Sequence, residues 1–177
     1  SSGISTNLSF STREKAEALN ILNILKGNEQ GDFLLGEQLE RSQAATFIVR
    51  LVGKEEHVLN NKANYNNTVF TDVPRNAWYA PYVGYCSENG IIAGVGDNLY
   101  KPNDKLSEKE LLKLVLTALG YEYGSGRDFD WTNVFEKAYQ VKLVDDPIYL
   151  TKTADNRNYT RGEVVKVLFN SLGLVHA

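Results

Sequence analysis

SEKELLKLVLTALG, at residues 107–120, occurs in three versions along this chain. The other two are ERSQAATFIVRLVG at residues 40–53 and TRGEVVKVLFNSLG at residues 160–173. Each version begins with a polar residue that can accept a hydrogen bond from the first turn of a helix, and Glu or Gln follows three residues later. Each ends at a glycine, which tolerates the left-handed conformation that closes a helix. We therefore expect one capped helix in each copy, ending at its last glycine.

The repeated unit is longer than this helix. Residues 11–53 align without a gap on residues 78–120, and apolar positions and a turn glycine coincide. The third copy is clear in its last helix, and residues 134–144 continue the same apolar rhythm upstream. Repetition of this kind indicates one structural unit used several times. Each unit is predicted to contain a helix, a short turn, a loop and the capped helix.

Composition favours one shared core. The chain has 177 residues, of which 42% are hydrophobic, and no single repeat is large enough to enclose a core of its own. We predict a mostly α-helical domain over residues 1–177. Its parts are a divergent repeat 1 at 9–53, a surface connector at 54–68, repeat 2 at 69–120, and repeat 3 at 121–177, divergent in its first half.

Charge and reactive residues exclude several functions. The formal charge of −3 argues against a broad surface for nucleic acid or anionic membranes, and no apolar run is long enough to insert into a membrane. Cys86 is the only cysteine, and we expect it to be a buried apolar residue. The only histidines, His57 and His176, form no metal or Ser-His-Asp constellation. We expect no metal and no cofactor.

Several short motifs agree with a known pattern. They are Phe70-Thr71-Asp72-Val73-Pro74, Trp78-Tyr79, Gly90-Ile91-Ile92-Ala93-Gly94 and Thr160-Arg161-Gly162-Glu163. Through them the chain resembles the S-layer homology (SLH) family, closely in repeat 2. Repeat 1 departs from the family pattern, with Glu-Arg-Ser-Gln at residues 40–43 where Thr-Arg-Ala-Glu is usual.

The resemblance implies a fold, a location and a partner. The fold is a pseudo-threefold bundle of three helix-loop-helix repeats formed by one chain. Such domains attach exported bacterial proteins to a secondary cell-wall polysaccharide, which is an acidic glycan with a pyruvate ketal on its terminal sugar. The location is therefore extracellular, at the bacterial cell wall or S-layer. S-layer or other surface proteins are a second class of expected partner.

Two arginines are the main candidates for binding this glycan. Arg41 and Arg161 follow the cap residue directly, where a cation opposes the helix dipole at a cost of about 0.3–1 kcal/mol. Stability alone would not select them there. Together with the unpaired amides of a first helical turn, a guanidinium would form a site for a carboxylate. Repeat 2 has Glu108 at this position, so only the adjacent Lys109 could supply a cation.

Aromatic and turn residues complete the candidate site. Trp78 and Tyr79 could stack on a sugar, although we expect Trp78 mainly to pack between repeats with one edge in a groove. Asp97 and Gly94 lie in a turn that could approach a ligand. The candidate polysaccharide-binding residues are Arg41, Arg161, Lys109, Asp72, Trp78, Tyr79, Gly94 and Asp97.

Two alternatives remain open at the level of sequence. Each arginine could instead form a structural salt bridge with an acid of the adjoining repeat. That role could coexist with glycan binding. Because repeat 2 lacks the arginine, the repeats could also be degenerate and serve as a structural or protein-interaction module. A glycosidase with paired carboxylates is the third possibility, but the sequence singles out no pair. We therefore predict a non-catalytic anchoring module.

Overall fold

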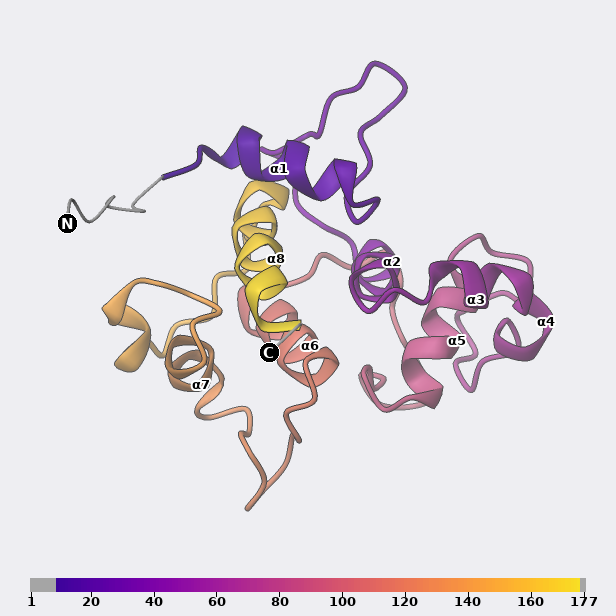
Figure 1. Ribbon diagram of the computed structural model, residues 1–177. Coiled ribbons are helices and arrows are strands. Elements are labelled where there is room, and N and C mark those ends of the chain that lie inside the picture. Colours follow the sequence, from indigo (N-terminus) through magenta and orange to yellow (C-terminus); the bar gives the residue numbers. More distant parts are fainter. Residues whose placement is uncertain (1–8, 176–177) are drawn as a thin grey trace.

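The computed structural model describes residues 9–175, and these residues form a mostly α-helical protein, as predicted. Extended structure within this range is limited to isolated bridges between single residues. Figure 1 shows the helices joined by long loops. In chain order the elements are α1 (Thr12–Ile21), α2 (Arg41–Leu51), α3 (Glu55–Asn60), α4 (Lys62–Tyr65), α5 (Ala80–Glu88), α6 (Glu108–Ala118), α7 (Val134–Gln140), the 3-10 helix η1 (Pro147–Leu150) and α8 (Arg161–Val175).

The starts of the repeated helices agree with the sequence. α2, α6 and α8 each begin directly after the predicted cap residue. The amide of Glu110 donates to the Ser107 hydroxyl at 3.3 Å, and that of Glu163 donates to the Thr160 hydroxyl at 3.3 Å. In α2, the Glu40 and Gln43 side chains form a capping box. These local bonds satisfy amides that the helix itself leaves without partners.

The predicted helix ends are right for two copies and wrong for the third. Gly53 and Gly120 have φ values of 73° and 101°, in the left-handed region that closes a helix. α8 instead continues through Gly173 to Val175. A glycine permits a helix to end but does not force it to end, and Gly173 keeps the right-handed helical conformation.

The second helices of the repeats, α2, α6 and α8, lie centrally (Figure 1), and α6 contacts both of the others. Each first helix packs on the second helix of another repeat: α1 on α8, α5 on α2, and α7 on α6. The aligned residues Leu19, Cys86 and Ala138 are fully buried at these contacts. The repeats therefore share their core. The predicted pseudo-threefold symmetry itself remains a prediction.

The first amides of the three central helices are bonded to loops of a neighbouring repeat. The loop of repeat 2 serves α2, that of repeat 3 serves α6, and that of repeat 1 serves α8. The arrangement is cyclic, so each repeat both supplies and receives these bonds. In α2, the Arg41 amide donates to the Asp104 carbonyl and the Ser42 amide to the Pro102 carbonyl. In α6, the Glu108 amide donates to the Asn156 carbonyl and the Lys109 amide to the Asp155 carboxylate. In α8, the Arg161 amide donates to the Glu37 carbonyl and the Gly162 amide to the Leu35 carbonyl.

The segment 54–68 is more than a surface connector, which corrects the prediction. It forms α3 and α4, which both pack on α5, and Val58 is fully buried. The Glu55 carboxylate accepts hydrogen bonds from Arg50 of α2 at 2.7 Å and from the Tyr82 hydroxyl at 2.9 Å. This contact ties the connector to both repeats, which sequence patterns of apolar residues alone did not reveal.

Gly84 is expected to be required where α4 approaches α5. A Cβ at this position would lie 1.8 Å from the Tyr65 carbonyl oxygen, whereas a Cβ at Gly173 would meet nothing within 4 Å. Gly84→Ala should lower the free energy of unfolding by about 1–3 kcal/mol, measured by urea denaturation. The matched control Gly173→Ala should raise it by about 0.5–1 kcal/mol. Equal effects of the two substitutions would contradict the close contact.

The Glu55 contact also predicts a pH dependence. Burial alone would raise the pKa of this carboxyl, but the hydrogen bonds from Arg50 and Tyr82 lower its pKa overall below the usual 4.5. The contribution to stability is therefore complete above the usual pKa and is lost as pH falls through the folded-state value. Between about pH 6 and pH 3, the wild type should lose about 1 kcal/mol more unfolding free energy than Glu55→Gln. Parallel curves for the two proteins would refute this assignment.

Candidate functional site

Three grooves occupy aligned places on the domain, with cavity volumes of about 250, 250 and 190 Å³. Each lies between the turn after a repeat's first helix and the second helix of that repeat. We call them grooves I, II and III after the repeat that supplies these elements. Groove I is lined by Lys26, Gly27, Asn28, Leu34, Gln43, Thr46, Phe47, Arg50, Trp78 and Arg161. Groove II is lined by Arg41, Ile91, Ile92, Ala93, Gly94, Val95, Tyr100, Leu106, Glu110, Lys113, Leu114 and Trp131. Groove III is lined by Leu143, Val144, Asp145, Asp146, Tyr149, Tyr159, Glu163, Lys166, Val167 and Asn170.

Groove I contains a buried cation without an acidic partner. Arg161 is 7% exposed, and its Nε donates to the Phe33 carbonyl at 2.9 Å. None of the ion pairs found within residues 9–175 includes Arg161, and no Asp or Glu lines this groove. Burial lowers the pKa of Arg161, while the charge of Glu37 opposes that effect. The guanidinium therefore keeps its charge in a partly desolvated place, where an incoming anion would be attracted most strongly.

Trp78 lies at the mouth of groove I, and the expectation that it mainly packs between repeats is wrong. It is 60% exposed, because it precedes α5 and makes only edge contacts with Tyr79 and Tyr82, at centroid distances of 5.5 and 6.4 Å. Its face is available to a ligand. Tyr79 is the cap residue of α5, is partly buried, and does not line any of the three grooves.

Groove II has its arginine neutralised. Arg41 forms an ion pair with Glu110, its Nε donates to the Tyr100 carbonyl at 2.8 Å, and its guanidinium lies 4.8 Å from the centre of the Tyr100 ring. The structural salt bridge that the sequence left open is therefore present at Arg41. Glu110 is aligned with Gln43 of groove I, so groove II has a carboxylate where groove I has a neutral amide.

The predicted contribution of free first-turn amides to an anion site is wrong. The amides that follow Glu40, Ser107 and Thr160 already donate to loops of the adjoining repeats, so they are not free to bind a ligand. The sequence could not show this, because the acceptors lie on loops that are distant along the chain. These helix-start amides therefore do not contribute to anion recognition in the grooves.

Groove III is acidic and has a reversed ion pair beside it. Asp145, Asp146 and Glu163 line the groove with a single lysine, Lys166. Glu108, at the position of the arginines, is 1% exposed; it accepts a hydrogen bond from Tyr149 and pairs with Lys152 at 2.7 Å. Here the helix supplies the anion and the loop supplies the cation. The sequence showed Glu108 only as a replacement for the arginine and did not reveal this pair.

Lys109 does not replace the missing arginine. It is 9% exposed, and its Nζ lies 4.5 Å from the centre of the Trp131 ring and 5.8 Å from that of Phe135. It lines none of the three grooves. The prediction of Lys109 as a groove cation is corrected by this packing between aromatic rings.

The remaining candidates have structural contacts. The Asp72 carboxylate accepts the Tyr100 amide at 2.9 Å and the Lys101 amide at 2.7 Å, so it holds the loop that serves α2. A Cβ at Gly94 would lie 2.6 Å from the Leu99 carbonyl oxygen, so the packing requires glycine at this position. Gly94 also lines groove II. Asp97 is an exposed turn residue with a φ of 55°, beside the outer end of groove II.

Sequence reasoning missed several groove residues. Gln43 and Thr46 in groove I, and Glu110 and Lys113 in groove II, stand at the same two aligned positions. A comparison of polar positions between repeats would have revealed that their charges differ.

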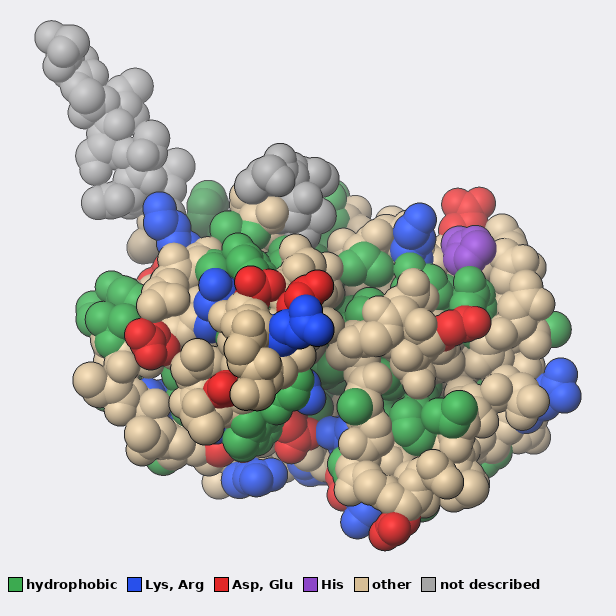
Figure 2. Space-filling model, turned by 90° about the horizontal axis from the view of Figure 1, so that it is seen from below, with side chains coloured by type: hydrophobic (Ala, Val, Ile, Leu, Met, Phe, Trp, Pro, Cys, Tyr) green, Lys and Arg blue, Asp and Glu red, His purple; other side chains and the backbone are tan. Residues whose placement is uncertain are grey.

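Other chemistries find no support within residues 9–175. No group of His, Cys, Asp and Glu is arranged to hold a metal ion, and none of the helices has the length and apolar character needed to cross a membrane. Cys86 is buried as predicted, and burial raises the pKa of its thiol to about 12. His176 lies outside the described residues. On the face in Figure 2, basic and acidic side chains are interspersed, as expected for a protein without a broad nucleic-acid surface.

Comparison with known proteins identifies the family of repeat 2. Residues 69–112 match the model of the S-layer homology domain. This chain contains an S-layer homology domain. The chain is also 29% identical over 155 residues to the "Middle cell wall protein" of Brevibacillus brevis, covering 87% of this chain and 14% of that protein. It is 30% identical over 152 residues to the "Cell surface protein" of Thermoanaerobacter kivui, covering 85% of this chain and 18% of that protein.

These matches support a cell-wall anchoring module and indicate a location at the cell surface, in association with the wall. One less similar match, 24% identical over 106 residues, is the "Exoglucanase XynX" of Acetivibrio thermocellus; it covers 60% of this chain and 9% of that protein. The chain thus spans less than a fifth of the length of each of these relatives. The matches as a group point to a non-enzymatic module.

The reversed pair beside groove III can be tested by a double-mutant cycle. Lys152→Ala should leave the buried Glu108 carboxylate without its cation and lower the unfolding free energy of the SLH domain protein by about 3 kcal/mol. Glu108→Gln should cost less, because the amide can still accept from Tyr149. Combining the two substitutions should recover about 1 kcal/mol or more relative to the sum of the single effects. Strict additivity of the measured effects would show that the pair contributes nothing.

Proposed function

We propose that this chain anchors its parent protein to the cell wall by binding an anionic, pyruvylated secondary cell-wall polysaccharide in groove I. The observation that carries the proposal is the buried Arg161 guanidinium, which has no carboxylate partner within the described residues, beside the exposed Trp78. The family match and the names of the cell-surface relatives support the anchoring role.

The chemistry of groove I suits an acidic sugar. Arg161 would pair with the carboxylate of the ketal, and a charge-assisted hydrogen bond of this kind is about twice as strong as a neutral one. Trp78 would lie against the apolar face of the sugar ring. Gln43 and Thr46 line the same groove and offer hydrogen bonds to hydroxyl groups. Capture by these contacts is reversible and needs no catalytic group.

The other grooves suit an acidic terminal sugar less well. Arg41 in groove II is already paired with Glu110, and groove III presents three carboxylates and one lysine. We propose that the single domain over 1–177 comprises repeats at 9–53, 69–120 and 121–177, with 54–68 joining the first two. Groove I would then be the principal glycan site of the domain.

A second candidate function is a structural or protein-interaction module. The neutralised Arg41 and the replacement by Glu108 favour it, because they remove the cation that the resemblance would place in two of the three grooves. Its partners would be S-layer or other surface proteins. Sedimentation with purified wall polysaccharide separates the two functions, since only the first requires the glycan and its acidic substituents.

Gln43→Glu should remove glycan binding without removing a groove side chain. The new carboxylate would stand where Glu110 neutralises Arg41 in groove II, and it would keep the capping box and favour the helix dipole. We expect affinity for acidic wall polysaccharide to fall about tenfold or more, while thermal stability stays the same or rises. Binding is measured by calorimetry with polysaccharide before and after removal of its ketals.

The matched control is Gln140→Glu, which adds the same charge on an exposed part of α7 that lines no groove. It should bind the polysaccharide as the wild type does. Trp78→Ala should weaken binding by about 1–2 kcal/mol without unfolding the domain. Unchanged binding by Gln43→Glu would exclude groove I as the anion site.

A further inference from the structure

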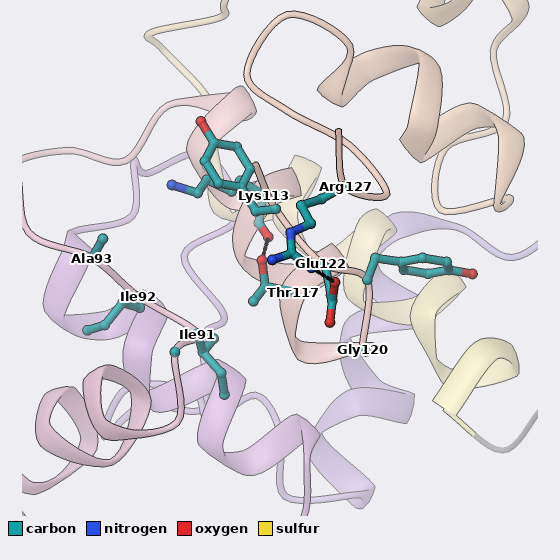
Figure 3. A pocket seen from close by; sticks show the side chains of 11 residues that line it. Ile91, Ile92, Ala93, Lys113, Thr117, Gly120, Glu122 and Arg127 are labelled. Carbon is teal, nitrogen blue, oxygen red and sulfur yellow. Dashed lines mark hydrogen bonds and ion pairs between the residues drawn. The ribbon is translucent and has the colours of Figure 1, made fainter. Parts of the chain in front are cut away.

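A larger cavity adjoins groove II and belongs to none of the aligned sites. Its volume is about 450 Å³, and we call it the side cavity. Figure 3 shows the turn residues Ile91, Ile92 and Ala93 on one side of it, with Lys113 and Thr117 of α6 and the connecting loop on the other. The full lining is Gly90, Ile91, Ile92, Ala93, Lys113, Thr117, Gly120, Tyr121, Glu122, Tyr123 and Arg127.

The side cavity is continuous with groove II. Both are lined by Ile91, Ile92, Ala93 and Lys113, so the Lys113 side chain lies at their junction. An outer cavity of about 360 Å³ shares Arg41, Val95 and Glu110 with groove II, on a different part of its wall. Groove II therefore adjoins two further cavities, each of which shares part of its lining. Such a row of cavities suits an extended chain better than a single terminal sugar.

One substitution distinguishes the side cavity from the corresponding place in repeat 1. Thr117 is aligned with Arg50, and at the same spacing Glu122 corresponds to Glu55. In repeat 1, Arg50 pairs with Glu55, which also accepts a hydrogen bond from Tyr82. The shorter Thr117 cannot reach Glu122, which pairs instead with Arg127 at the surface at 3.1 Å. The exchange of arginine for threonine leaves the space open.

The walls of the side cavity have a consistent chemistry. Ile91 and Ile92 form an apolar wall, and the opposite wall carries the Lys113 ammonium, which lies 3.9 Å from the centre of the Tyr123 ring. Lys113 takes part in none of the ion pairs among residues 9–175. Burial lowers the pKa of Lys113, and the charge of Arg41 lowers it further. The half-buried ammonium would gain from a carboxylate, and the apolar wall would gain from a sugar face.

We propose that groove II and the side cavity form one cleft that binds an internal stretch of at least two consecutive sugars of the acidic wall glycan, with Lys113 contacting an acidic substituent at the junction. This inference rests on the proposed function, because it takes the same glycan as the ligand. It adds a second, chain-length-dependent site to the terminal-sugar site in groove I. The long polymer would then contact the domain in both places.

The test compares long and short ligands. Wall polysaccharide from the bacterium that makes this protein is used intact and as its purified terminal monosaccharide, and binding is measured by calorimetry. Thr117→Arg should fill the side cavity by pairing with Glu122, as Arg50 does with Glu55. Its affinity for the intact polysaccharide should fall about tenfold, and its affinity for the monosaccharide should not change. Thr153→Arg, which adds the same charge at an exposed position that lines none of the described cavities, is the matched control and should bind both ligands like the wild type.

A second variant keeps the test valid if Thr117→Arg does not fold. Lys113→Thr copies Thr46 at the aligned position of groove I and should cause the same selective loss for the long ligand. If both variants bind the intact polysaccharide like the wild type, the cleft is not a binding site, whereas the site in groove I still stands. If the wild type binds neither ligand, the proposed function and this inference both fail.

Discussion

The amides that begin α2, α6 and α8 take their acceptors from loops of a neighbouring repeat, and the rest of the structure depends on these bonds. A helix leaves its first amides without internal partners, and burying them unpaired would cost about 1–3 kcal/mol each. Here repeat 1 serves α8, repeat 2 serves α2, and repeat 3 serves α6. Because the pattern is cyclic, no repeat can be removed without exposing a helix start in another. The same bonds hold the loops that border the grooves.

The cyclic pattern also determines which groups the side chain of the first helical residue can contact. The Arg41 and Arg161 side chains follow the same route, each donating to a carbonyl of the loop that serves its helix, at Tyr100 and Phe33. What differs is the residue opposite, which is Glu110 in groove II and Gln43 in groove I. An arginine at one repeated position is therefore a structural ion-pair member in one groove and an uncompensated cation in another. Beside groove III the first helical residue is the acid Glu108, and its partner Lys152 is the cation.

Repetition with small changes thus gives the domain three unequal grooves. Groove I has a net positive lining, groove II is nearly balanced, and groove III is acidic. The side cavity next to groove II includes Thr117, which stands where repeat 1 has Arg50. These differences lie in polar residues on the walls, while the apolar residues beneath them are retained. Packing constrains the core residues of every repeat, whereas wall residues can change without loss of the fold.

The sequence by itself determined the helical class, the starts of α2, α6 and α8, the burial of Cys86 and the likeness to SLH domains. These features follow from local patterns: a cap residue and its partner are three residues apart, and apolar spacing reports which face is buried. Only the tertiary structure decided that the helix amides are occupied, that Trp78 is exposed, that Arg41 is neutralised and that Arg161 is not. The bonded amides and the two arginines depend on partners more than 40 residues away in the chain, such as Phe33 for Arg161 and Glu110 for Arg41. The exposure of Trp78 depends on packing that leaves its ring uncovered. Short-range patterns carry no information about such partners, because electrostatic and hydrogen-bonding contacts are set by distance in space.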